Sequence, residues 1–253
     1  MLSPRLMPCL LMSNGALVKT VRFKNPTYVG DPINAIRIFN QKEVDELILL
    51  DIEATTSGRG IDYDTIEKVV SECFMPICYG GGVRTVEEMR RLYYLGIEKI
   101  SLGAATFEVP DLIRRAADEF GNQAVVVTLD VRKTLLGGYS VRTRRGANDM
   151  RLSAVVAAQR AEAVGAGEIL LYSIDRDGTW SGFDLKLITE VTNAVGVPVI
   201  ACGGAGSMVD VGLAVHEAGA SAVAIGSMVV FQGKDLGVLI KYPTRKSQEE
   251  VLG

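Results

Sequence analysis

One apolar stretch of the sequence ends on an acid, and a similar stretch does not. AVVVTLDV (124–131) carries Asp130 at its end, whereas RLMPCLLM (5–12) ends on Leu11 and its apolar neighbours. Two carboxylates that face each other can serve general acid–base chemistry, because one can give a proton while the other takes one. Leucine cannot transfer a proton, so the sequence offers one half of such a pair.

Glycine-rich turns follow four other apolar stretches, at GGGV (80–83), SLGAA (101–105), CGGAG (202–206) and IGS (225–227). Glycine lets backbone N–H groups approach an anion closely, so these turns predict two phosphate sites that face each other. The alternative is that the glycines only make tight turns. The candidate phosphate-binding residues are Gly82, Gly103, Ala104, Gly178, Gly204, Gly226 and Ser227.

Four charged residues each open an apolar stretch, namely Arg5, Glu46, Lys99 and Glu168. Two positive and two negative charges can neutralise one another at one end of the fold, where unpaired charge would be costly. The alternative is that strand starts are charged simply because they meet solvent.

The elements that would position these residues alternate along the chain. Eight short apolar runs are expected as strands, at 5–12, 46–52, 75–81, 99–105, 124–131, 168–175, 198–204 and 222–227. Segments with helical spacing of apolar residues separate them, which indicates a parallel sheet covered by helices. Eight such units in 253 residues predict an α/β fold, a (β/α)8 TIM barrel that forms one domain over 1–253. An open, doubly wound sheet is the alternative.

An internal repeat supports the barrel. ELILLDIEATTSGRGIDYD from Glu46 aligns without gaps with EILLYSIDRDGTWSGFDLK from Glu168. A self-similar period is typical of repeated structural units, so we expect two half-barrels, at about 1–122 and 123–253. The alternative is that strand–helix units resemble one another generically.

Composition narrows the class of protein. The net charge is -3 and charges of both signs are scattered, which predicts no nucleic-acid partner. The basic run at 142–145 is interpreted as a solvated loop, and the alternative is that an anionic partner or substrate docks there. No stretch is long and apolar enough to span a bilayer and the start lacks a secretory signal, so we expect a cytoplasmic protein without membrane contact. Four cysteines without C-x-x-C spacing and a single histidine, His216, predict free thiols, a structural histidine, and neither metal nor cofactor.

The motifs resemble one family over nearly the whole chain. The matching stretches include NGALVK (14–19), GDP (30–32), GGG (80–82), GGAG (203–206) and, most specifically, GAGEILLYSIDRDGTWSG (165–182). They are similar to the cyclase subunit of imidazole glycerol phosphate synthase. The resemblance implies a twofold-repeated (β/α)8 barrel, ammonia supplied by a glutaminase subunit at its N-terminal rim, and a ribonucleotide substrate with two phosphates.

The resemblance also implies roles for single residues. The family uses two facing aspartates at the ends of strands 1 and 5, of which the second matches Asp130 and the first falls on Leu11. Gly103 and Ala104 stand where the family usually has Asn-Thr. Alternation along the strand from Glu168 places Tyr172 inside the mouth, where the family has a smaller residue. The residues that follow the family pattern are Lys19, assigned to catalysis, the mouth residues Asp51, Asp175 and Asp177, and the phosphate-binding Ser227. The tail departs from the family, because Pro243 stands where a last helix would run on.

At the other end, all four charged strand starts match the family's gate for ammonia. Above this gate, alternate strand residues would form a mostly apolar interior column that passes neutral ammonia and disfavours ammonium. The expected column is Met7, Cys9, Ile48, Leu50, Val126, Thr128 and Leu170.

All four charged residues of the gate are present, whereas Leu11 stands in place of one of the two acids. This combination leads to one hypothesis and two alternatives. The chain resembles the branch of the family found with surface-polysaccharide biosynthesis, which helps to convert an acetamido group on a nucleotide sugar into an acetamidino group. The hypothesis is a synthase-type subunit that receives ammonia for this purpose, with a ribonucleotide or nucleotide sugar as phosphorylated substrate. The alternatives are a genuine cyclase of histidine biosynthesis, in which Lys19 or Asp51 replaces the missing acid, and a non-catalytic scaffold for a glutaminase or sugar amidotransferase.

Overall fold

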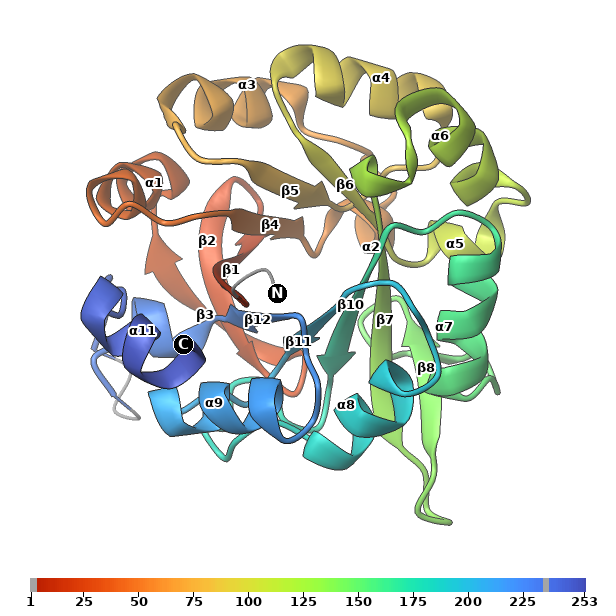
Figure 1. Ribbon diagram of the computed structural model, residues 1–253. Helices are drawn as coiled ribbons and strands as arrows, with labels where there is room; N and C mark the ends of the chain where they lie inside the picture. The colour runs from red at the N-terminus through yellow and green to blue at the C-terminus, as the bar shows by residue number, and fades with distance from the viewer. Residues whose placement is uncertain (1–3, 234–236) are drawn as a thin grey trace.

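The computed structural model describes residues 4–233 and 237–253, and within them eight parallel strands close into a barrel (Figure 1). Each strand pairs with the next along the ring, and β1 closes the ring against β12 with Arg5 opposite Ala222. The expected (β/α)8 barrel is thereby confirmed. The barrel strands are β1 (Arg5–Ser13), β4 (Leu47–Asp51), β5 (Ile77–Gly80), β6 (Lys99–Leu102), β7 (Val125–Lys133), β10 (Glu168–Ser173), β11 (Val199–Cys202) and β12 (Ala222–Ile225).

Helices surround the strands on the outside of the ring (Figure 1). The longer ones are α1 (Pro32–Gln41), α3 (Tyr63–Glu72), α4 (Val86–Leu95), α6 (Leu112–Phe120), α7 (Ala154–Ala163), α8 (Leu185–Thr192), α9 (Met208–His216) and α11 (Arg245–Leu252). The short ones are α2 (Ala54–Ser57), α5 (Ala105–Glu108), α10 (Ser227–Val230) and the 3-10 turn η1 (Asn122–Ala124). None of the helices in the described part of the chain is long and apolar enough to cross a bilayer.

Side chains at the helix starts explain where several helices begin. Asp31 caps α1 by accepting a hydrogen bond from the Asn34 N–H, and Thr85 and Glu88 form a reciprocal capping box at α4. Such caps satisfy backbone donors that have no partner inside the helix. These caps therefore fix the points at which the preceding loops give way to α1 and α4.

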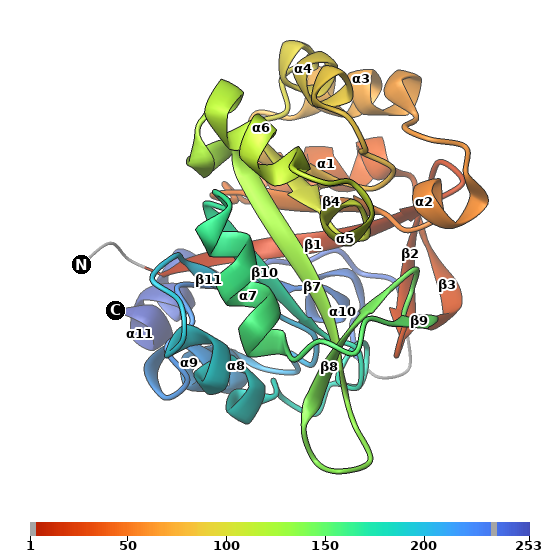
Figure 2. The ribbon, with the colours of Figure 1, turned by 90° about the vertical axis from the view of Figure 1, so that its right-hand side faces the viewer.

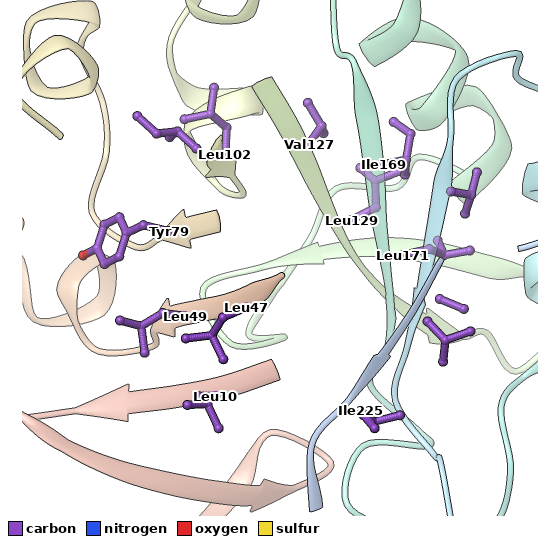
Figure 3. Packing of buried hydrophobic residues seen from close by; sticks show 14 of the residues in the cluster. Leu10, Leu47, Leu49, Tyr79, Leu102, Val127, Leu129, Ile169, Leu171 and Ile225 are labelled. Atoms are coloured by element: carbon purple, nitrogen blue, oxygen red, sulfur yellow. The ribbon is translucent and has the colours of Figure 1, made fainter. Parts of the chain in front are cut away.

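Strand side chains divide between two apolar layers. In β1, Leu6 and Leu10 face the helices, whereas Met7, Cys9 and Leu11 face the barrel interior. Figure 3 shows part of the outer layer, which is the core between strands and helices. The inner layer confirms the expected alternation and is Met7, Cys9, Leu11, Val18, Ile48, Cys78, Val126, Leu170, Tyr172, Ile200, Cys202, Ala222 and Ala224.

Two β-hairpins were not expected from the sequence. β2 (Ala16–Val21) and β3 (Lys24–Gly30) form one, and β7 continues into β8 (Tyr139–Thr143) and β9 (Asn148–Asp149) in the other. Figure 2 shows both at the end of the barrel opposite the start of β1. Lys19 therefore lies on β2.

The tail ends in a helix after all. Thr244 caps α11 directly after Pro243, so the proline precedes the helix and does not interrupt it. His216 contacts this helix through a hydrogen bond between its Nε2 and the Val251 carbonyl (2.7 Å), a structural role as expected. The Tyr242 hydroxyl donates to the Leu6 carbonyl (2.6 Å), which holds the tail against the first strand.

Candidate functional site

The larger of two cavities at the barrel mouth, about 130 Å³ in volume, lies at the C-terminal ends of β4 to β7. Active sites of (β/α)8 barrels occur at this end of the strands. The residues predicted for the site that line it are Leu11, Asp51, Gly82, Gly103, Ala104, Asp130 and Tyr172.

Asp130 is the acid best placed for proton transfer in this cavity. Its side chain is half-buried, and none of the described residues donates a hydrogen bond to the carboxylate. Burial, followed by repulsion from Asp177, raises the pKa of Asp130 to about 7. A carboxyl group with such a pKa can both give and take a proton at neutral pH. The Leu11 side chain lines the same cavity and offers no second acid.

Asp51 also borders the cavity, but its carboxylate is already engaged. It accepts hydrogen bonds from the N–H groups of Glu53 and Ala54 (both 3.0 Å) and forms an ion pair with Arg59. Burial raises the pKa of Asp51, and these donors partly offset that effect. Asp51 therefore anchors the turn into α2 and is a poor replacement for the missing acid.

Tyr172 lies at the mouth, paired on β10 with Asp130 of β7. Its hydroxyl donates to Asp177 Oδ1 (2.9 Å), and its ring packs edge-on against Phe23 with centroids 4.9 Å apart. Burial and the nearby Asp177 carboxylate raise the pKa of Tyr172 well above its usual value. The phenol therefore stays protonated as a hydrogen-bond donor.

A smaller cavity, about 20 Å³ in volume, lies beyond Tyr172 at the ends of β11 and β12. Lys19 borders it, and the Lys19 ammonium donates a hydrogen bond to the Cys9 carbonyl. Its predicted residues are Lys19, Tyr172, Asp177, Gly178, Gly204, Gly226 and Ser227. The structure therefore places the candidate phosphate residues in two separate groups.

Asp175 is the one predicted mouth residue that borders neither cavity. Its Oδ2 accepts a hydrogen bond from the Lys133 N–H (2.8 Å) at the end of β7. The carboxylate thus holds the extended β7 strand in place.

Arg144 and Arg145 line the larger cavity, which corrects the interpretation of the run at 142–145 as a solvated loop. Arg145 pairs with Glu53 (2.8 Å) and Arg144 with Glu108 (3.1 Å). The β8 hairpin brings both arginines back over the mouth. The only signal for this in the sequence was their position shortly after Asp130.

The four charged strand starts form one ion-pair cluster at the N-terminal rim. Arg5 contacts Glu46 (2.6 Å) and Glu168 (3.0 Å). Lys99 contacts the same two carboxylates, at 2.9 and 3.0 Å. Because each cation touches both anions, the four charges neutralise one another beneath the apolar interior.

Comparison with known proteins places the chain in a family. The profile of the family described as "Histidine biosynthesis protein" matches residues 5–235. A Pseudomonas aeruginosa protein provisionally named imidazole glycerol phosphate synthase subunit hisF2 is 53% identical over 243 residues, 96% of this chain and 97% of its own. The Streptomyces coelicolor imidazole glycerol phosphate synthase subunit HisF is 42% identical over 236 residues, 93% of this chain and 94% of its own. The chain therefore belongs to the histidine biosynthesis protein family, as a HisF-like barrel subunit of the imidazole glycerol phosphate synthase type.

Proposed function

We propose that this barrel receives ammonia from a glutaminase bound at its N-terminal rim and passes it to acetamidino-group formation on a nucleotide sugar for a surface polysaccharide. The observation that carries the proposal is the contrast between the two ends of the barrel. The rim keeps its complete set of four paired charges, whereas the mouth has one free acid, Asp130.

The interior supports transfer of ammonia in its neutral form. Ala222 stands opposite Arg5 of the charged rim, and further along the interior the inward side chains of the neighbouring strands are apolar. Moving an ammonium ion into such a lining would cost several kcal/mol, on the order of the penalty for any unpaired buried charge. Ammonia carries no charge and escapes this cost.

The mouth argues against the ordinary cyclisation. Leu11 is 2% exposed and packs among apolar side chains, so this position offers no acid. Asp51 is tied to α2, and Lys19 lies in the other cavity. A pair of facing acids is thus absent from the described mouth residues.

Two experiments test the proposal in cells. The gene should fail to restore growth of a histidine auxotroph that lacks the cyclase subunit, and robust growth at normal expression would overturn the proposal. In the native host, deletion should leave the surface glycan with acetamido groups where the parent strain has acetamidino groups, which mass spectrometry distinguishes.

Transfer through the barrel is tested by blocking the interior. Ala222→Leu would add bulk to the inward side of β12 next to the charged rim, whereas Val223→Leu adds bulk to the helix-facing side of the same strand. We expect the first variant to lose product formed from glutamine and to keep product formed from added ammonium, and the second to keep both. Equal loss from both nitrogen sources would refute transfer through the interior, and no loss from either would support the scaffold alternative.

A genuine cyclase remains the second candidate, favoured by the retained Asp130 and its pKa near neutrality. It requires the twin-phosphate substrate to fit the mouth. The same complementation experiment decides between the two candidates.

A further inference from the structure

A wall of four residues crosses the barrel mouth. Tyr172 and Asp177 come from β10 and the loop after it, and Thr20 and Phe23 come from the β2–β3 hairpin. The Asp177 carboxylate accepts three hydrogen bonds, from the Tyr172 hydroxyl (2.9 Å), the Thr20 hydroxyl (2.6 Å) and the Phe23 N–H (3.0 Å). These bonds and the edge-on contact with Phe23 hold the Tyr172 ring in one place.

The wall separates the two groups of candidate phosphate residues. Among the described residues, Tyr172 alone lines both the larger and the smaller cavity. The smaller cavity, at about 20 Å³, has room for about one water molecule. A ligand that spans both cavities would have to displace the Tyr172 ring and break the hydrogen bond to Asp177.

Charge also favours one side of the wall. The larger cavity is lined by three arginines and two aspartates, whereas the smaller one has one lysine and one aspartate. The Lys19 ammonium is already bound to the Cys9 carbonyl, and Asp177 faces the same space. The charged lining residues of the larger cavity are Asp51, Arg84, Asp130, Arg144 and Arg145.

We propose that the mouth binds ligands through a single anionic group in the larger cavity, and that Tyr172 is the specificity-determining residue that denies a binding site to a second anion at the other end of the ligand. The ligand class is a phosphomonoester or a molecule with one comparable anionic group. This inference rests on the proposed function, in which no twin-phosphate substrate is turned over.

Matched ligands test the proposal. The probes are linear alkanediol bisphosphates of graded length, each compared with the monophosphate of the same diol, titrated into the isolated chain by calorimetry. Trp180, the single tryptophan of the sequence, borders the smaller cavity and reports its occupation through its fluorescence. We expect the wild-type chain to bind both members of each pair within about threefold of each other, with unchanged Trp180 emission.

Two variants sharpen the test. Tyr172→Ala removes the wall and should favour one bisphosphate over its monophosphate by about tenfold or more, the gain expected from hydrogen bonds to a second charged group, with a change in Trp180 emission. Tyr172→Phe keeps the ring and should behave as the wild type.

The proposal is overturned if the wild-type chain prefers a bisphosphate by about tenfold with a Trp180 response, if it binds no monophosphate, or if a folded Tyr172→Ala chain gains no preference. Should Tyr172→Ala fail to fold, the wild-type titration alone decides. The assay contains neither glutamine nor ammonia, so its failure is distinguishable from a failure of ammonia transfer.

Discussion

Replacing Asp130 by asparagine should stabilise the protein at neutral pH and leave it nearly unchanged in acid. Asp130 has a pKa of about 7 in the folded chain against an ordinary value of 3.8, so between these pH values the folded state holds a proton that the unfolded state has lost. Wild-type stability therefore falls as the pH rises from about 4 to about 7 and is level above that range. Asparagine does not titrate, so the stability of the variant does not show this fall with rising pH.

The size of the effect follows from the shift. About three pKa units correspond to about 4 kcal/mol at 1.36 kcal/mol per unit, and partial hydration of the carboxylate at the cavity reduces this to about 2 kcal/mol. For a chain of this length, that difference should raise the Tm of Asp130→Asn over that of the wild type by about 4–8 °C at pH 7.5.

The assay is thermal unfolding of both proteins at a series of pH values, followed by circular dichroism. Asp118→Asn, which changes an exposed carboxylate on α6, is the control and should show no such trend. A difference in Tm between Asp130→Asn and the wild type that stays constant from pH 4 to pH 8 would refute the account of Asp130 as a half-buried acid with a raised pKa.

Three further predictions concern the mouth, the rim and the wall. Leu11→Asp alone should give no cyclase activity, because Tyr172 still divides the mouth; Leu11→Asp with Tyr172→Thr should give measurable turnover of the twin-phosphate ribonucleotide. Lys99→Met should lower the free energy of unfolding by about 2–3 kcal/mol in urea denaturation, because two carboxylates then share one cation. Gly178→Ala should lower it by about 2 kcal/mol or more, because a Cβ would lie 2.2 Å from a carbonyl oxygen of β2 at a φ of +68°.

Each of these predictions has its own control. Activity from Leu11→Asp alone would show that Tyr172 is no barrier. Lys68→Met removes an exposed lysine of α3 and should cost less than about 0.5 kcal/mol. Gly137→Ala places a Cβ in open space at a φ of +84°, so it measures the backbone strain without a close contact to a carbonyl oxygen. It should lower the free energy of unfolding by less than Gly178→Ala.

The barrel itself was predictable because buried parallel strands are apolar throughout. All eight expected runs became barrel strands, and the alternation from Arg5 through Leu11 placed the interior column correctly. The β2–β3 hairpin was not predictable in this way. β3 is mostly exposed and contains Pro26, so it lacks the apolar pattern of a strand.

The residues of the site could be predicted from the sequence, but the way they are arranged could not. Position along each strand indicated that Asp130 and Tyr172 would lie at the mouth, and the structure brings them together. The wall could not be inferred, because it depends on contacts between Asp177 and Thr20, which are 157 positions apart in the chain. The two half-barrels and the functional roles of the site residues stay predictions.

The distance along the chain between such partners has a consequence for folding. β1 pairs with β12, and the Tyr242 hydroxyl reaches back 236 positions to the Leu6 carbonyl. During synthesis, one edge of β1 therefore stays unpaired until β12 has left the ribosome, when nearly the whole chain has been made. Unpaired apolar edges of this kind promote aggregation. Chains truncated before β12 should accordingly aggregate rather than form a smaller barrel, and production of this protein should depend on how quickly its C-terminal end becomes available.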